Sequence, residues 1–474
     1  MTDGLKPYPE YKDTGLPWLG CIPAHWNLRR IKTIAIINPS KSEAEQNRRQ
    51  NVSVIFLPME RVSTDGRLDY REQRPATEVW NGLTYFRRGD VIVAKITPCF
   101  ENGKGACLES LPTQIGFGST EFHVLRPRSR ISAQFLYLLT TEPKFRKLGA
   151  DNMTGTAGQK RVPTEFVKNC PIALPPPKEQ DAIVRFLDYA NRRIERCIRA
   201  KRKVITLLNE QKQTIIHRAV TRGLDPSVPL KPSRNPWLAK IPEHWEERRA
   251  KYFYREVDDR SLAGAEELLS VSHITGVTPR SQKNITMFMA ASYIGHKTCE
   301  PGDLVINTMW AWMGALGIAR RRGIVSPSYG VYRPLRSDAF VPEFVDCLLR
   351  TKPFVDEYRC RSTGIRSSRL RLYPEQFLDI PLIRPSHREQ ERITAFVAAN
   401  TLQLDNLMAE SAREIALLRE FRTRLIADVV TGQLDVREAA ARLPDETQEP
   451  EPLYAESDDI EGIEAADEPI EAEA

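Results

Sequence analysis

The sequence predicts an α+β protein with an internal pseudo-two-fold repeat, in which two similar globular domains are separated by a pair of long antiparallel coiled-coil helices. Two observations carry this prediction. The second half of the chain repeats distinctive residues of the first half in the same order, and each half ends in a long segment with heptad spacing.

The repeat is clearest in rare residues. Pro17-Trp18-Leu19 and His25-Trp26 recur 219 positions later as Pro236-Trp237-Leu238 and His244-Trp245. Further pairs follow in order: Gly89-Asp90 with Gly302-Asp303, Arg126-Pro127 with Arg333-Pro334, Thr154-Gly155 with Thr363-Gly364, and Glu179-Gln180 with Glu389-Gln390. The unit is far longer than the repeat of a solenoid, so it indicates a duplicated globular domain with its own helix.

Within each repeat, a mixed domain precedes the long helix. Short apolar runs such as 91–96 and 304–307 predict strands, while 133–140 and 343–349 predict short helices. Proline clusters at 175–177 and 381–385 end each mixed domain. We therefore divide the chain into a first globular domain (1–172), a first helix (173–222), a linker and second globular domain (223–382), a second helix (383–443) and an acidic tail (444–474).

The two long segments place apolar residues at alternating steps of four and three, which is typical of a coiled-coil seam. Equal length and polar seam positions at Lys201 and Ser411 favour pairing of the helices with each other; the alternative is two amphipathic helices lying on separate cores. Equivalent contacts in both repeats require an antiparallel pair. The predicted seam contains Ile183, Leu187, Ile194, Val204, Leu208, Ile393, Leu404, Leu407, Leu418 and Leu425.

The charge of the chain is unevenly distributed. The 474 residues carry a net charge of +7, but residues 444–474 hold thirteen acidic residues and no basic one, so residues 1–443 carry +20. Such a basic body favours a polyanionic partner such as nucleic acid, although basic residues also serve solubility alone. The tail is expected to be disordered; a second possibility is that it competes with DNA for the basic surface.

Composition and motifs exclude several classes of protein. No apolar run is long enough to cross a membrane, and no signal peptide is evident at the beginning of the sequence. The eight cysteines lack zinc-ligand spacing and indicate reduced thiols in a cytoplasmic protein with no metal site. Phosphate-binding and hydrolase motifs are absent, so no catalytic residue is assigned, although a nuclease with scattered acidic residues would leave little trace.

These features together resemble the specificity subunit of type I restriction-modification systems. The resemblance is most specific over residues 8–32, the segment 221–245, its echo at 430–443, and the proline–helix junctions 175–180 and 385–390. It implies that each globular part is a target-recognition domain for one half of a split DNA sequence, and that the helices set the gap. It also implies two docked modification subunits that use S-adenosylmethionine to methylate adenine. A restriction subunit would use ATP and Mg²⁺, and the chain itself would bind no cofactor.

Three loop segments in each globular domain are candidates for DNA contact. They are 95–104, 118–122 and 154–161 in the first domain, and 307–314, 325–329 and 363–371 in the second. Their divergence inside a shared frame is what two different half-sites require, since amide and basic side chains suit base edges and phosphates. The predicted DNA-contacting residues are Lys95, Asn102, Lys104, Lys160, Arg161, Asn307, Trp310, Trp312, Arg366 and Arg369.

Each of these candidates also has a structural interpretation. The tryptophans can pack their own loop, and the basic loops can be solvated surface. The repeated His25-Trp26 and His244-Trp245 pairs lie beside a proline turn in both repeats, which favours a structural role over catalysis. For the whole chain, the alternatives are a coiled-coil scaffold for an acidic protein and a self-contained nuclease.

Overall fold

The computed structural model describes residues 5–156, 158–283, 292–364 and 370–444. The described chain divides into two compact units. Unit 1 contains described residues up to 200 together with 413–444, and unit 2 contains the described residues of 201–412. Among the described residues, no helix is both long and apolar enough to cross a membrane.

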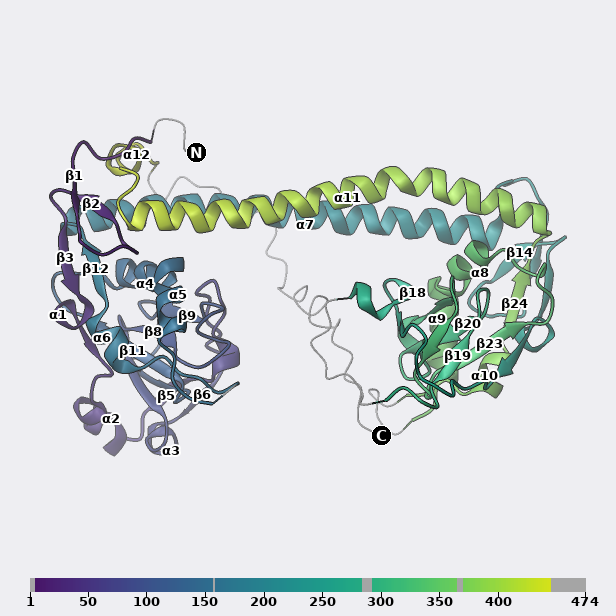
Figure 1. Ribbon diagram of the computed structural model, residues 1–474, viewed down its shortest axis with the longest axis horizontal. Coiled ribbons are helices and arrows are strands. Elements are labelled where there is room, and N and C mark those ends of the chain that lie inside the picture. The colour runs from purple at the N-terminus through teal and green to yellow at the C-terminus, as the bar shows by residue number, and fades with distance from the viewer. Residues whose placement is uncertain (1–4, 157, 284–291, 365–369, 445–474) are drawn as a thin grey trace. The chain divides into compact units, whose positions relative to one another are not determined.

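Unit 1 is built on two four-stranded sheets and two short strand pairs (Figure 1). One sheet has the order β6-β5-β10-β7, and the other has the order β4-β11-β8-β9. The helix α4 packs on β8 and β9. The strands are β1 (Tyr11–Asp13), β2 (Cys21–Pro23), β3 (Asn27–Arg30), β4 (Ala35–Ile37), β5 (Ser53–Leu57), β6 (Gln73–Pro75), β7 (Thr84–Arg87), β8 (Val91–Ala94), β9 (Gly105–Cys107), β10 (Ile115–Gly118), β11 (Phe122–Pro127) and β12 (Pro171–Leu174). The short helices are α1 (Ile31–Ile34), α2 (Glu45–Arg49), α3 (Ala76–Val79), α4 (Ala133–Thr141), α5 (Pro143–Asp151), α6 (Thr164–Asn169) and α12 (Arg437–Ala441).

Unit 2 repeats much of this plan. Its four-stranded sheet, β16-β23-β20-β21, corresponds to β4-β11-β8-β9, and α8 packs on β21 as α4 does on β9. The pairs β13-β14 and β15-β24 correspond to β1-β2 and β3-β12. The strands are β13 (Leu230–Pro232), β14 (Lys240–Pro242), β15 (Glu246–Arg249), β16 (Tyr254–Val257), β17 (Leu269–Ser272), β18 (Gly276–Pro279), β19 (Lys297–Cys299), β20 (Leu304–Ile306), β21 (Leu316–Ile318), β22 (Gly323–Val325), β23 (Gly330–Pro334) and β24 (Pro381–Arg384). The short helices are α8 (Pro342–Leu349), α9 (Lys352–Arg361) and α10 (Pro374–Leu378).

The repeated sequence pairs brace the two equivalent sheets. Arg126 on β11 binds Asp90, just before β8, through Nε–Oδ1 and Nη2–Oδ2 contacts of 2.7 and 2.8 Å. In unit 2, Arg333 binds Asp303 in the same bidentate way at 3.0 and 2.9 Å. Both aspartates are buried, so each ionised carboxylate depends on its arginine for compensation. The prediction of an α+β fold with an internal repeat is confirmed.

Two long helices continue from one unit into the other. The helix α7 covers Pro177–Arg222, and α11 covers His387–Val430. Proline stands at the first position of α7, where a missing N–H leaves no hydrogen bond unmade. Each helix is followed closely by a glycine with positive φ, Gly223 at 76° and Gly432 at 77°, a conformation that ends a helix.

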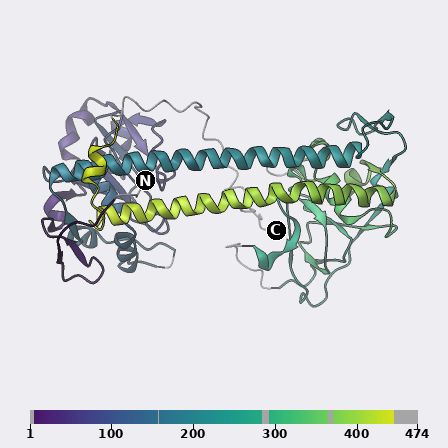
Figure 2. The same cartoon turned by 90° about the horizontal axis from the view of Figure 1, so that it is seen from above.

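In each unit, one half of α7 lies alongside one half of α11 (Figures 1 and 2). Glu195 pairs with Arg422 in unit 1, and Lys212 pairs with Asp405 in unit 2. From the first pair to the second, the residue number rises from 195 to 212 along α7 and falls from 422 to 405 along α11. The two helices therefore run antiparallel.

The burial pattern corrects part of the predicted seam. Ile183, Leu187, Ile194, Ile393, Leu404 and Leu425 are buried, and Leu208 and Leu418 are half-buried. Val204 and Leu407 are exposed by 45% and 41%, whereas their neighbours Ile205 and Met408 are half-buried. The inner stripe of each helix is therefore displaced by one residue at these positions. The cause is a run of two adjacent apolar residues, either of which satisfies heptad spacing.

The second helix is also shorter than the predicted segment 383–443. The helix α11 ends at Val430, and a turn containing Gly432 leads to α12. The acidic tail lies outside the described residues from position 445 onward.

Candidate nucleic-acid interface

In unit 1, the backbone brings the three predicted loop segments together. Thr97 N–H donates to the Lys160 carbonyl at 3.0 Å, and Val162 N–H donates to the Lys95 carbonyl at 2.8 Å. Lys95 N–H in turn donates to the Glu121 carbonyl at 2.8 Å. The described parts of 95–104, 118–122 and 154–161 therefore form one surface, which we call the unit 1 loop cluster.

The equivalent segments converge in unit 2. Leu372 N–H donates to the Thr308 carbonyl at 3.0 Å, and Thr308 Oγ1 donates to the Ser328 carbonyl at 2.8 Å. The described parts of 307–314, 325–329 and 363–371, with Leu372, form the unit 2 loop cluster. Sequence reasoning selected these segments one by one but did not predict that they meet.

The predicted DNA-contacting residues of the unit 1 loop cluster differ in how far they are exposed. Asn102 and Lys160 are exposed, and Lys95 is half-buried. Lys104 is half-buried and its Nζ donates to the Met59 carbonyl at 3.1 Å, so this ammonium holds the loop in place. Lys160 is the prediction whose side chain best suits a phosphate contact.

Arg161 has a partner that the sequence prediction missed. Its Nε and Nη2 each donate to one carboxylate oxygen of Glu121, both at 2.9 Å. The hydrogen bonds from Arg161 hold the pKa of Glu121 below its usual range, so the carboxylate stays ionised at neutral pH. Two basic residues, Lys95 and Arg161, thus flank one acidic residue within the cluster.

Asn307 departs from its prediction as a base-contacting residue. It is only 4% exposed, and its Nδ2 donates to the Tyr329 hydroxyl at 3.1 Å. The amide therefore supports the interior of the loop cluster. When a polar residue lies at the end of an apolar strand, the sequence alone does not show whether its side chain contacts a DNA base or is buried and supports the fold.

The two predicted tryptophans of unit 2 form a half-buried aromatic pair. The rings of Trp310 and Trp312 stack with centroids 5.9 Å apart, and the guanidinium of Arg359 lies 5.8 Å from the Trp312 centroid. Trp312 Nε1 donates to the Met309 carbonyl at 3.0 Å. The pair packs its own loop and still presents some ring surface to solvent.

Arg371 is a further candidate that the sequence prediction did not select. The backbone of Arg371 forms an antiparallel β-bridge with Thr363, and Arg161 forms the same bridge with Thr154. The two arginines are therefore equivalent in the repeat. Arg371 is exposed, and its Nη2 lies 3.9 Å from Met309 Sδ. The sequence repeat aligns Thr154 with Thr363, and this alignment is the feature of the sequence that points to Arg371 as a candidate. The predicted phosphate contacts Arg366 and Arg369 lie outside the described residues.

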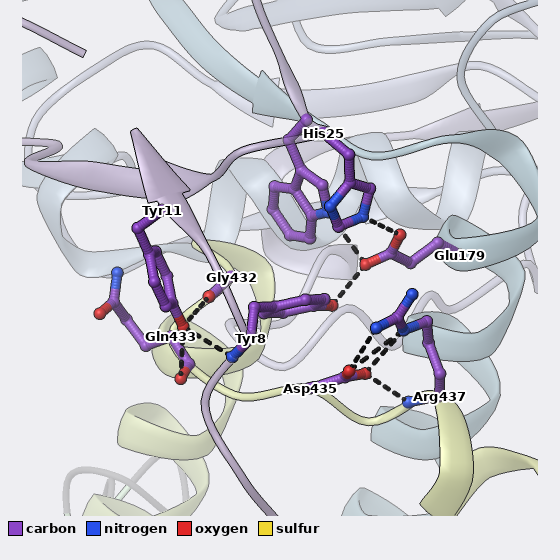
Figure 3. A network of polar contacts seen from close by, with 9 residues as sticks. Tyr8, Tyr11, His25, Glu179, Gly432, Gln433, Asp435 and Arg437 are labelled. Atoms are coloured by element: carbon purple, nitrogen blue, oxygen red, sulfur yellow. Dashed lines mark hydrogen bonds and ion pairs between the residues drawn. The ribbon is translucent and has the colours of Figure 1, made fainter. Parts of the chain in front are cut away.

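The repeated His-Trp pairs bind an acidic residue at the start of each long helix, which is buried in unit 1 and half-buried in unit 2. Glu179 accepts hydrogen bonds from Trp26 Nε1 at 2.9 Å, from His25 Nε2 at 2.8 Å and from the Tyr8 hydroxyl (Figure 3). In unit 2, Glu389 accepts from Trp245 Nε1 and His244 Nε2, both at 3.0 Å. The pairs join β2-β3 and β14-β15 to the helices, which is a structural role.

The network in unit 1 also joins the two ends of the described chain. Tyr11 Oη donates to the Gly432 carbonyl at 3.0 Å, and the backbones of Lys6 and Asp435 form an antiparallel β-bridge. Asp435 binds Arg437, whose guanidinium lies 5.2 Å from the Tyr8 ring centroid (Figure 3). Among the described residues, no cluster of histidine, cysteine and acidic side chains is arranged to hold a metal ion.

Comparisons with known proteins agree with this layout. Residues 23–206 match the family described as type I restriction modification DNA specificity domain. The chain is 36% identical over 243 residues to the type I restriction enzyme EcoAI specificity subunit of Escherichia coli, covering 51% of this chain and 39% of that subunit. It is 42% identical over 166 residues to the EcoEI specificity subunit of the same organism, covering 34% of this chain and 27% of that subunit. The matched region thus spans less than half the length of these curated relatives.

A solved structure supports the fold over most of the chain. It was determined in work on complex assembly and conformational transition of the type I R-M system, and it matches with a TM-score of 0.63 at 17% sequence identity. The match covers 86% of this chain and 98% of that one. With the family match over residues 23–206, the two specificity-subunit relatives and the repeated layout, the chain is similar to the specificity subunits of type I restriction-modification systems.

Proposed function

We propose that this chain is the DNA-sequence-recognition subunit of a type I restriction-modification complex. Each loop cluster reads one half of a split DNA sequence, and the chain itself is not catalytic. The observation that carries the proposal is the convergence of three divergent segments on the same repeated frame in both units. A shared frame with different surface residues is what two different half-sites require.

The long helices have two roles in this proposal. They set the length of the unread gap between the half-sites, and they dock two modification subunits. Those subunits bind S-adenosylmethionine and methylate adenine, and a restriction subunit with ATP and Mg²⁺ cleaves DNA that lacks the methyl groups. The chain needs no cofactor of its own. All eight cysteines are free thiols, which suits the reducing cytoplasm where host DNA lies.

The test uses the full chain assembled with its modification subunits and a library of randomised DNA duplexes. We expect the bound duplexes to share one split sequence, with affinity that falls as salt rises. Equal binding to all duplexes would contradict the proposal and favour a coiled-coil scaffold. Cleavage of DNA by the isolated chain with Mg²⁺ would instead show a nuclease.

A further inference from the structure

We infer that Glu121 is a specificity-determining residue of unit 1, because it orients Arg161 to read a guanine base rather than to hold a phosphate. The inference rests on the proposed function. Glu121 is a positioning residue in this account, and Arg161 is the residue that contacts DNA.

The hydrogen bonds of Arg161 leave a defined set of donors. The side of the guanidinium that carries Nε and Nη2 faces Glu121, with both contacts at 2.9 Å. Nη1 donates to the Gln159 carbonyl at 3.2 Å. Since the group has five N–H bonds, one remains on Nη1 and one on Nη2. Two parallel N–H donors match the N7 and O6 acceptors that guanine presents in the major groove.

Both partners in this contact are anchored through their backbones. Arg161 forms bridges with Thr154 and Ile96, and the Glu121 carbonyl accepts from Lys95 N–H. The Arg161 side chain is 44% exposed and that of Glu121 is 22% exposed. A guanidinium fixed at its base and along one side loses little conformational freedom when it meets a base, which favours geometric selection.

Charge argues against a phosphate as the partner of Arg161. The carboxylate that neutralises the guanidinium also repels a phosphate that approaches it. The exposed Lys160, for which the described structure shows no such carboxylate contact, is better placed for that purpose. A base edge carries no net charge, so the nearby carboxylate does not oppose its binding.

Unit 2 provides a natural comparison. Arg371 is equivalent to Arg161, but the residue at the position of Glu121 is Ser328. Within the described residues, no carboxylate contacts Arg371. The equivalent arginines Arg161 and Arg371 therefore have different neighbours. The contact with a carboxylate in unit 1 is one of the differences between the two loop clusters.

The experiment compares variants of the full chain, assembled with its modification subunits, on the randomised duplex library. Glu121→Gln removes the charge that orients Arg161, and Arg161→Lys keeps a positive charge but removes the two parallel donors. Glu101→Gln is the matched control, because Glu101 lies in the same cluster and contacts Thr97 Oγ1 at 2.9 Å instead of Arg161. Base preference and the dependence of affinity on salt are measured for each variant.

We expect Glu121→Gln and Arg161→Lys to reduce the preference for guanine at the same position of one half-site by about tenfold or more. The other half-site and the Glu101→Gln variant should keep the wild-type preference. The inference is overturned if Glu121→Gln strengthens binding to all duplexes alike and leaves the preferred sequence unchanged. It is also overturned if the two variants affect different positions. A wild-type complex without any preferred sequence would overturn the proposed function as well.

Discussion

Lys212 on α7 donates a hydrogen bond from Nζ to Asp405 Oδ1 on α11 at 2.6 Å. The repeat offset of 210 residues turns this pair into Arg422 and Glu195, which form an ion pair in unit 1. The basic residue of each pair thus lies near the C-terminus of one helix, and the acidic residue lies in the first half of the other. This relationship fixes the same antiparallel register in both units.

A double-mutant cycle at Lys212 and Asp405 should reveal a coupling free energy of about 0.5 kcal/mol, because the pair is partly exposed. The cycle uses Lys212→Ala, Asp405→Ala and the double variant, with the free energy of unfolding measured in urea at low salt. The coupling should shrink as salt screens the charges. The matched cycle at Glu195 and Arg422 should behave alike, and zero coupling in both would contradict the register described here.

The equivalent acidic residues Glu179 and Glu389 at the helix starts differ in burial, so the same substitution should have unequal effects. Glu179→Ala should lower the free energy of unfolding by about 3 kcal/mol, since it leaves the donors of Tyr8 and Trp26 without partners in the interior. Glu389→Ala should cost about 1.5 kcal/mol, because Glu389 is more exposed and binds no tyrosine. Denaturant unfolding of the two variants measures the difference, and equal losses would argue against it.

Tyr8→Phe tests the additional contact separately. Burial and the hydrogen bond to Glu179 raise the pKa of Tyr8, so the hydroxyl is a neutral donor at physiological pH. The substitution should cost about 1 kcal/mol and make unit 1 resemble unit 2 at this site. A variant as stable as the wild type would show that the hydroxyl adds nothing.

His123 on β11 predicts a loss of stability in mild acid. Burial lowers the pKa of His123, although the Val162 carbonyl and Glu121 oppose the shift and Lys95 adds to it. The unfolded chain therefore takes up the proton first, and stability falls as the pH drops below about 6.5. The loss is at most about 1.4 kcal/mol per pH unit for one group. Urea unfolding of the wild type at pH 7.5 and 5.5 should show a larger loss than unfolding of His123→Gln, and parallel losses would refute the assignment.

Lys160 predicts a contribution to affinity that is independent of sequence. Lys160→Ala should weaken binding to all duplexes alike and reduce the slope of log affinity against log salt by about 1. Lys104→Ala serves as the control, because the Lys104 ammonium is held by the Met59 carbonyl and should leave the slope unchanged. A change of preference at a single base pair in Lys160→Ala would show instead that this residue reads a base.

The repeat and the helices could be predicted from sequence because they depend on order and spacing along the chain. What the repeated residues do could not. Asp90 and Arg126 are 36 positions apart, and only the antiparallel pairing of β8 with β11 brings them into contact. The one-residue displacement at Val204 and Leu407 has a similar origin, since two adjacent apolar residues fit the heptad equally well and the partner helix selects between them.

The loop clusters show the same limit at the candidate site. Polar loop segments were predicted correctly as neighbours of strands, but their convergence depends on long-range backbone hydrogen bonds such as the one between Val162 and Lys95. Asn307 was selected for its amide, whereas Tyr329 provides that amide with a partner inside the fold. Glu121 was not selected because an acidic residue has little apparent value in a DNA-binding surface until its contact with Arg161 is known.

Unit 1 is built from two separate parts of the chain, described residues up to 200 and residues 413–444, and this has a consequence for biosynthesis. The Tyr8 and Tyr11 segment is completed by residues around Gly432 and Asp435, whereas the described part of unit 2 comes from the continuous stretch 201–412. A ribosome therefore synthesises every residue of that stretch before it makes the segment that closes unit 1. Unit 1, whose translation begins first, can therefore be completed only after the whole of 201–412 has been synthesised.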